Sequence, residues 1–248
     1  GETADLPHQV QTGVFDVSVH ARVQESDIVR GDVQPGDRIW GFASDGQTIW
    51  EDEPNSGIMS NGLTLARIAM MSGMYTEKYP DLMRQGGKYE GRFLIGSKVE
   101  TLGDMTIGQA LISPTRQWAI LIKMLLDELK VKRLTHLLHG ITMNTGGGAT
   151  KVSHLGKGGV YYRKQMPLPP AIFQVIQSES GETWADMYKG FNCGVGIDII
   201  GDAKLAPILE ALSAVTGIRL YELGTCVSHS GTGNKVGLGT AFGDFDFP

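Results

Sequence analysis

Residues 134–148, LTHLLHGITMNTGGG, join an apolar run to a threonine and three glycines. The run 134–143 is predicted to be a buried strand, because apolar side chains dominate it and turn-forming residues follow. The glycines have no side chains, so their amides can approach a ligand closely, and successive amides form a concavity that suits an anion. Thr145 adds a hydroxyl and Lys151 a nearby positive charge. A phosphate-binding loop is the functional interpretation, and a flexible turn is the structural one.

Composition and charge limit the class of protein. The chain has 248 residues, of which 41% are hydrophobic and 20% charged, enough for one large domain or two smaller ones. The net charge of −5 argues against a nucleic-acid partner, because counterion release needs a basic face; a glycine loop can still hold a phosphorylated small molecule. Cys193 and Cys226 are the only cysteines; they form neither a disulfide framework nor a zinc motif, which favours a reducing, cytoplasmic compartment. No membrane association is expected, since no apolar run is long enough to span a bilayer.

The remaining pattern predicts an α/β (α+β) fold in which a mixed β-sheet is backed by helices. Strands are predicted at residues 14–24, 38–43, 134–143, 193–200 and 218–227, with a glycine-rich hairpin at 231–239. Helices are predicted after residues 60–61 and 113–114, and at 171–176, 183–190 and 204–215. The less regular residues 73–112 are predicted to be an insertion within the domain rather than a separate domain.

The segment SNG at residues 60–62 is predicted to begin a helix with Ser60 and Asn61 at its N-cap. A helix N-terminus offers free amides and a partial positive charge to an anion, and Arg67 lies about two turns into the same helix. Ordinary capping is the alternative. The segment SDG at residues 44–46 likewise combines a hydroxyl with a glycine. The apolar side of the helix is predicted to contain Leu63, Ile68 and Met71.

The segment SPTR at residues 113–116 is predicted to begin the clearest helix of the chain. Serine at the N-cap and proline at the first helical position are both favoured there. Arg116 could bind a phosphate or carboxylate through two nitrogens, and an exposed first-turn residue is the alternative. Apolar residues at helical spacing should face the core: Trp118, Leu121, Leu125 and Leu129.

Histidine, cysteine and acidic residues give weaker signals. His136 and His139 lie in the predicted strand, where their odd spacing would put one on each face, and structural roles are favoured. Cys193 could be a nucleophile, but no ordered Ser/Cys–His–Asp set accompanies it, so a buried structural thiol is favoured. Glu2 and Asp5 could coordinate Mg²⁺, which prefers hard oxygen ligands; a solvated chain end is the alternative.

Taken in order, these segments resemble the motifs of one family. The matching stretches are GETADLP (1–7), FDVSV (15–19), GDRIWGFASDG (36–46), SNGLTLAR (60–67), SPTR (113–116), TGGG (145–148), PPAIF (169–173) and MYKGFNCGVG (187–196). The family is aminoimidazole ribonucleotide synthase, also called phosphoribosylformylglycinamidine cyclo-ligase, and the resemblance spans nearly the whole chain. Its pattern has histidines where Met59 and Met143 stand here, and the loop 46–60 and the insertion 73–112 are longer, as in a long-loop branch of the family.

The resemblance implies that this chain is the second part of a two-domain enzyme. Residues 1–34 would be the last strand region of a truncated N-terminal ATP-binding domain, and residues 35–248 the C-terminal synthase-like domain with an insertion at about 73–112. Intact members use ATP and Mg²⁺ to close the imidazole ring of formylglycinamidine ribonucleotide in purine biosynthesis, and they form homodimers mainly through the N-terminal domain. The fragment alone is expected to lack activity.

The resemblance also implies binding roles, but it assigns no catalytic acid or base. Glu2 and Thr3 would face the nucleotide–metal site, with Glu2 as a metal ligand. The cleft for the phosphorylated ribonucleotide would be lined by Ser44, Gly46, Ser60, Asn61, Gly62, Arg67, Thr115, Arg116, Thr145, Gly146, Gly147, Gly148 and Asn192. This hypothesis requires two glycine-bearing turns to converge on one pocket.

Two alternatives to the cyclo-ligase hypothesis remain open. One is another ATP-using member of the same superfamily, of the formylglycinamidine synthase, selenophosphate synthetase, thiamine-monophosphate kinase or hydrogenase-maturation type. The other is a phosphate-binding module that retains the cleft and lacks catalysis.

Overall fold

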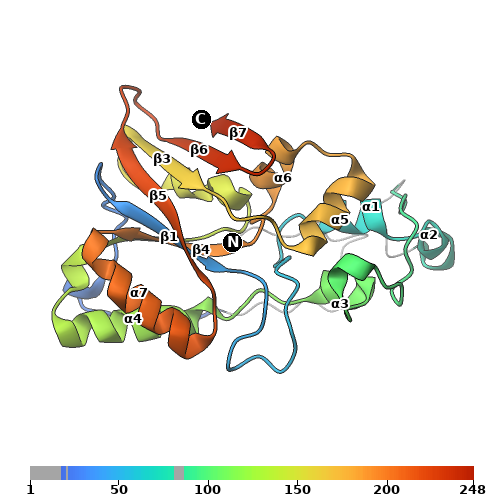
Figure 1. Ribbon diagram of the computed structural model, residues 1–248, viewed down its shortest axis with the longest axis horizontal. Helices are drawn as coiled ribbons and strands as arrows, with labels where there is room; N and C mark the ends of the chain where they lie inside the picture. The colour runs from blue at the N-terminus through green and yellow to red at the C-terminus, as the bar shows by residue number, and fades with distance from the viewer. Residues whose placement is uncertain (1–17, 21, 81–86) are drawn as a thin grey trace.

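A seven-stranded sheet forms the centre of the protein in the computed structural model, which describes residues 18–20, 22–80 and 87–248 (Figure 1). Its strands are β1 (Arg38–Ala43), β2 (Leu138–Met143), β3 (Val160–Gln165), β4 (Val195–Gly201), β5 (Leu220–Ser228), β6 (Lys235–Thr240) and β7 (Gly243–Phe247). Their order across the sheet is β2-β4-β1-β5-β3-β6-β7. Neighbouring strands are antiparallel except β3 and β6, which run parallel.

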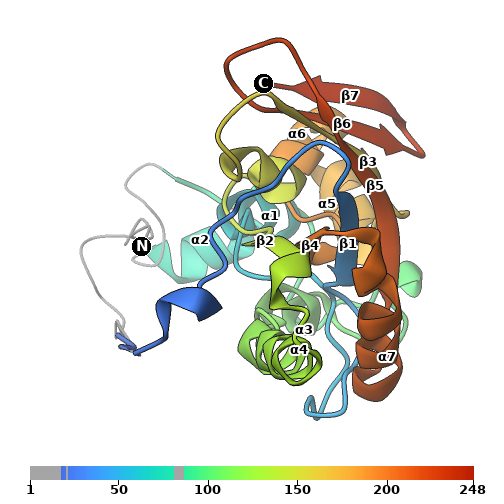
Figure 2. The same cartoon turned by 90° about the vertical axis from the view of Figure 1, so that its left-hand side faces the viewer.

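Helices lie on both sides of the sheet, as predicted for the α/β class (Figures 1 and 2). They are α1 (Leu63–Met70), α2 (Met74–Lys78), α3 (Ile107–Ile112), α4 (Trp118–Lys132), α5 (Ala171–Ser180), α6 (Trp184–Gly190) and α7 (Ala206–Thr216). One core packs α4 and α7 against the sheet, and a second packs α1, α3, α5 and α6 against its other face. The central strands are therefore apolar on both faces, which is why β4, VGIDIIG, is an almost continuous apolar run and wholly buried.

Several elements are where local pattern predicts them. Strand β1 matches its predicted range, and α5, α6, α7, β4 and β5 begin within about two residues of their predicted starts. The predicted inward face of α4 is also confirmed, because Trp118, Leu121, Leu125 and Leu129 are all buried. Among the helices of the described residues, none is long and apolar enough to cross a membrane.

The predicted hairpin at 231–239 is wrong. Strand β3 lies between β5 and β6 and pairs with both, so the chain crosses over β3 before β6 begins. The hairpin that does form joins β6 to β7. Glycine spacing predicts a turn, but it does not determine which strand pairs with β5 in the sheet.

The predicted capping of two helices is also wrong, because no side chain caps α1 or α4, although α1 begins within about two residues of its predicted start. Helix α1 begins at Leu63, after a left-handed Gly62, and no side chain caps it; its fully buried residues are Ala66, Ala69 and Met70. Leu63 is partly buried and packs against the core, as predicted, and Ile68 is partly buried. Met71, just beyond the helix, is buried as predicted. Helix α4 begins at Trp118, and the Ser113 hydroxyl instead accepts a hydrogen bond from the Ser56 amide.

The two remaining predicted strands differ from the structure at their beginnings. The described part of the predicted strand 14–24 has no regular structure, and the rest lies outside the described residues. The run 134–143 begins with a 3-10 helix, Thr135–Leu137, before β2, and β2 is an edge strand rather than a fully buried one. His136 therefore lies in the 3-10 helix, and only His139 is in the strand.

The described part of the insertion 73–112 packs into the core that contains α1, α3, α5 and α6. Ile107, Ala110 and Leu111 of α3 are buried there, together with the partly buried Tyr75 and Phe93. A capping box between Thr106 and Gln109 fixes the start of α3. These contacts join the described part of the insertion to that core.

Candidate functional site

Residues 190–194, the end of α6 and its connection to β4, are contacted from three of the predicted binding segments or the residue next to them. The Ser44 hydroxyl donates to Asn192 Oδ1 at 2.8 Å. Asn61 Nδ2 donates to the carbonyl of Gly190 at 2.8 Å, and the amide of Ala149 donates to the carbonyl of Phe191 at 3.1 Å. Turns that are about 100 residues apart in the sequence therefore contact one short segment, through side chains that are buried at Ser44, Asn61 and Asn192. The convergence of the turns on one pocket stays a prediction.

Two glycines make this close approach possible. Gly62 has a φ of +75°, and a Cβ there would lie 2.2 Å from the ring of Phe191. Gly148 has a φ of +52°, and a Cβ there would lie 2.4 Å from the carbonyl oxygen of Phe191 and 2.6 Å from that of Tyr188. Both positions need glycine for its conformation and for its lack of a side chain.

The loop 145–148 offers fewer free amides than its sequence suggests. The amide of Thr145 donates to the Met143 carbonyl, and that of Gly148 donates to the Thr145 carbonyl. The amides of Gly146 and Gly147 have no hydrogen bond within the described part of the chain. Two donors thus remain for an anion. The aliphatic part of Lys151 lies 3.5 Å from the position of a Cβ on Gly147.

A buried polar cluster beneath this loop was not predicted. The Lys164 ammonium of β3 lies 2.6 Å from the Asp198 carboxylate of β4, and both side chains are fully buried. Asn144, which directly precedes the loop, donates to Asp198 at 3.2 Å. Burial raises the pKa of Asp198 above its ordinary value, while Lys164 and Asn144 lower it. The sequence did contain a signal, because Lys164 occurs at the same every-second-residue spacing as the inward residues Val160 and Tyr162.

Arg116 is a structural residue here, contrary to its prediction as a phosphate ligand. Its guanidinium is buried and donates to both carboxylate oxygens of Glu51, at 2.8 and 2.9 Å. It also donates to the carbonyls of Ala43 at 2.7 Å and Gly46 at 3.0 Å. The arginine therefore fixes the loop that carries Ser44, and its charge is already compensated.

We expect Arg116→Lys to lower the free energy of unfolding by about 2 kcal/mol, because lysine cannot reproduce the planar set of donors. Urea denaturation would measure the loss. The matched control is Arg219→Lys, which alters an exposed ion pair with Asp45 on the same loop and should cost less than about 0.5 kcal/mol. Equal losses in the two variants would contradict this role for Arg116.

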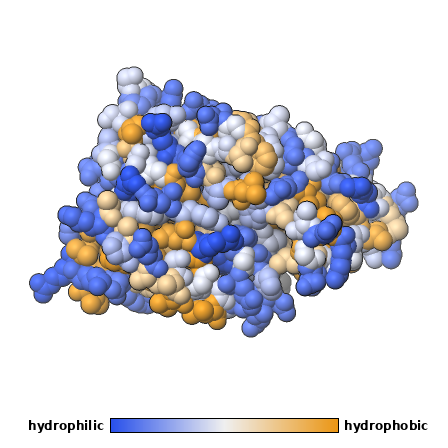
Figure 3. Space-filling model, viewed as in Figure 1, coloured by the Kyte–Doolittle hydropathy of each residue, from blue (hydrophilic) through white to orange (hydrophobic). Residues whose placement is uncertain are grey.

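A cavity of about 570 Å³ collects three more of the predicted residues, Ser60, Arg67 and Thr115, and its size suits a small-molecule ligand. The insertion supplies much of its wall, including Tyr75, Tyr79 and Tyr89. Arg67 is exposed and has no ion pair within the described residues. Hydrophobic residues are visible among hydrophilic ones at this end of the molecule, around α2 and α3 (Figure 3).

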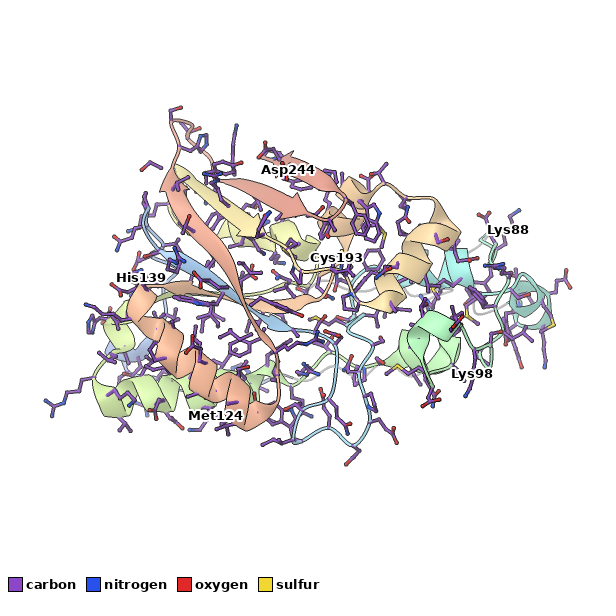
Figure 4. All side chains as sticks on the ribbon, viewed as in Figure 1. Lys88, Lys98, Met124, His139, Cys193 and Asp244 are labelled. Carbon is purple, nitrogen blue, oxygen red and sulfur yellow. The ribbon has the colours of Figure 1, made fainter. Side chains whose placement is uncertain are left out.

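Cys193 and His139 do not form a catalytic pair. Cys193 is buried in the middle of the molecule, whereas His139 lies well away from it on the edge strand β2 (Figure 4). His139 Nδ1 instead lies 2.9 Å from the carboxylate of Asp37. Burial raises the pKa of both Cys193 and Cys226 well above the usual thiol value. Both observations agree with the predicted structural thiol at position 193.

Both cysteines should therefore fail to react with a thiol reagent such as DTNB in the folded protein at pH 8. A buried thiol with a raised pKa supplies neither access nor thiolate. Both should react quickly once the protein is unfolded in urea, which serves as the positive control. Rapid modification of either thiol in the folded state would contradict the burial described above.

The predicted nucleotide–metal residues Glu2, Thr3 and Asp5 lie outside the described residues. Within residues 18–20, 22–80 and 87–248, no group of three or more His, Cys, Asp or Glu side chains could hold a metal ion. The roles of the other predicted binding residues stay predictions.

Comparison with curated proteins finds relatives that carry the same name. No family model matches the chain. It is 30% identical over 232 residues to the phosphoribosylformylglycinamidine cyclo-ligase of Paraburkholderia phymatum, covering 91% of this chain and 54% of the relative. It is 32% identical over 200 residues to the phosphoribosylformylglycinamidine cyclo-ligase of Anaeromyxobacter sp., covering 79% of this chain and 48% of the relative. The chain thus spans about half the length of the curated relatives it matches.

Solved structures give weaker matches. The hydrogenase maturation protein HypE aligns with a TM-score of 0.47 and 16% identity, over 88% of this chain and 54% of that one. The T. maritima PurL complexed with FGAR aligns with a TM-score of 0.45 and 12% identity, over 91% of this chain and 29% of that one.

Proposed function

We propose that this chain, which resembles the phosphoribosylformylglycinamidine cyclo-ligases over about nine tenths of its length, is the substrate-binding part of an ATP-dependent enzyme of that family. The complete enzyme would close the imidazole ring of formylglycinamidine ribonucleotide in purine biosynthesis. The observation that carries the proposal is the meeting of three predicted binding segments at residues 190–194, with two loop amides left for an anion.

In this proposal the loop 145–148 holds the phosphate group of the ribonucleotide. The amides of Gly146 and Gly147 donate to phosphate oxygens, and the Lys151 ammonium adds a positive charge. Backbone donors fixed in advance need no reorganisation when the anion binds, which favours both binding and orientation.

The cavity beside α1 supplies a second set of polar groups. Arg67 has a charge that no acid neutralises within the described residues, and the hydroxyls of Ser60 and Thr115 lie in the same cavity. This set suits a negatively charged or hydroxyl-bearing part of the ligand. The tyrosines of the insertion would cover its apolar part.

ATP and Mg²⁺ enter the proposal through the family resemblance only. The described residues contain no cluster that could hold a metal ion, so we derive no step through either group. The ATP-dependent step and the homodimer are proposed for the complete protein, and the chain alone is expected not to turn over. Met59 and Met143, two of the methionines of the chain, also supply no imidazole where the family pattern has a histidine.

The test is calorimetric titration of the chain and of the complete protein with formylglycinamidine ribonucleotide and with ATP. We expect the chain to bind the ribonucleotide without turnover and the complete protein to release ADP. Turnover by the chain alone would contradict its assignment as one part of the enzyme. Absence of ribonucleotide binding by the complete protein would refute the function, and ADP release with another substrate would favour another member of the superfamily.

Lys151→Ala should weaken ribonucleotide binding by about fivefold to tenfold, because it removes a charge beside the phosphate. Calorimetry would measure the change in the dissociation constant. Lys123→Ala is the matched control, since Lys123 is an exposed lysine paired with Asp127 on α4. Equal effects of the two substitutions would mean that only overall charge matters.

A further inference from the structure

The buried pair formed by Lys164 and Asp198 joins two strands that are not neighbours. Strands β1 and β5 lie between β4 and β3. The register partner of Asp198 on β1 is Gly41, and that of Lys164 on β5 is Gly224. Register partners share a face of the sheet, so on the two intervening strands the positions nearest to the charged residues carry no side chain. On the outer sides, Asp198 pairs with Thr142 of β2 and Lys164 with Leu238 of β6.

This pair contacts both ends of the loop 145–148. The Lys164 ammonium donates to the carbonyl of Ala149, the residue after the loop, at 3.1 Å. Asp198 Oδ1 accepts from the side chain of Asn144, the residue before the loop, at 3.2 Å. Asn144 is held further through its amide, which donates to the carbonyl of Gly196 at 2.9 Å.

Stability alone is a poor explanation for such a pair. Removing two charges from water is costly, and replacing a buried ion pair with apolar residues of similar volume is often neutral or stabilising. Apolar side chains could not, however, supply directional bonds to the Ala149 carbonyl and the Asn144 side chain. What the pair provides, and apolar side chains could not, is therefore a set of hydrogen bonds that hold the two loop ends in place.

We propose that Lys164 and Asp198 are positioning residues that fix the loop 145–148, and with it the two free amides of Gly146 and Gly147, for an anionic phosphate group. This inference rests on the proposed role of the loop as an anion site. Neither residue touches the ligand, since both are fully buried beneath the loop.

The test compares the wild-type protein with the double variant Lys164→Met/Asp198→Leu, which replaces the ion pair with apolar side chains of similar size. We expect a urea midpoint close to wild type, at least a tenfold weaker dissociation constant for inorganic phosphate, and at least tenfold faster hydrogen exchange at the amides of Gly148 and Ala149. Exchange in β4 should be unchanged. A role in stability alone would not produce this combination. Lys123→Met serves as the control for loss of a lysine.

A folded double variant with wild-type phosphate affinity and wild-type loop exchange would overturn the inference. If the double variant does not fold, Asn144→Ala replaces it, because this substitution removes the side-chain bond between one loop end and Asp198 while keeping the ion pair; unchanged loop exchange would then overturn the inference. If the wild-type protein shows no phosphate-dependent shift of the Gly146 and Gly147 amides, the proposed anion role fails. Hydrogen exchange in the variants still decides whether the pair positions the loop.

Discussion

Asp198→Ala should lower the free energy of unfolding by about 3–5 kcal/mol, because it leaves the Lys164 ammonium buried without its partner. The ammonium is fully buried, and its other hydrogen-bond acceptor is the Ala149 carbonyl. A carbonyl dipole compensates a buried positive charge far less than a carboxylate at 2.6 Å. Urea denaturation followed by circular dichroism would measure the loss.

The informative control for Asp198→Ala is the addition of Lys164→Met in the same chain. Removing the uncompensated charge should restore most of the lost stability, so the two substitutions should be strongly non-additive. Additive losses would show that the charges do not depend on one another. The result would also separate the cost of an unpaired charge from the cost of a cavity, which the double variant retains at position 198.

Gly148→Ala is expected to cost about 3 kcal/mol, from left-handed backbone strain and from overlap with neighbouring backbone. The new Cβ would lie 2.4 Å from the Phe191 carbonyl oxygen and 2.6 Å from that of Tyr188, and neither atom can rotate away as a side chain could. The amide of Ala149 would then lose its bond to Phe191, so the loop should also lose phosphate affinity. Urea denaturation and phosphate titration measure the two effects.

The matched control is Gly147→Ala, one residue earlier in the same loop. Gly147 also has a positive φ, of +93°, but the nearest atom to its Cβ position is in the flexible side chain of Lys151, at 3.5 Å. Only the conformational strain applies there, about 1–2 kcal/mol. If both variants lose the same stability, the close packing of Gly148 against residues 188–191 is not what requires glycine.

The parts of the fold that were predicted correctly depend on local periodicity. Strand β1 and the buried face of α4 follow from apolar spacing within a few residues, and that spacing is set by the backbone repeat itself. The positions of the glycine turns were visible for a similar reason, because few residues other than glycine adopt a positive φ readily. Convergence of the turns was expected only from the resemblance.

Three of the errors involve partners that are distant in the sequence. Ser113 does not cap a helix, because its hydroxyl bonds to the amide of Ser56. Arg116 is not free for a ligand, because Glu51 lies 65 residues away in sequence and 2.8 Å away in space. The order β5-β3-β6 likewise depends on a strand that occurs some 60 residues before β5.

The sequence by itself determined the α/β class, most of the helices and strands, and the glycine turns, because each of these follows from periodicity and backbone conformation within a short stretch. Only the tertiary structure decided the strand order, the bonding of Arg116 to Glu51, and the pairing of Lys164 with Asp198 beneath the loop. The physical reason is that hydrogen bonds and ion pairs depend on distances in space. The sequence around a side chain in one strand does not indicate which residue of another strand it will contact.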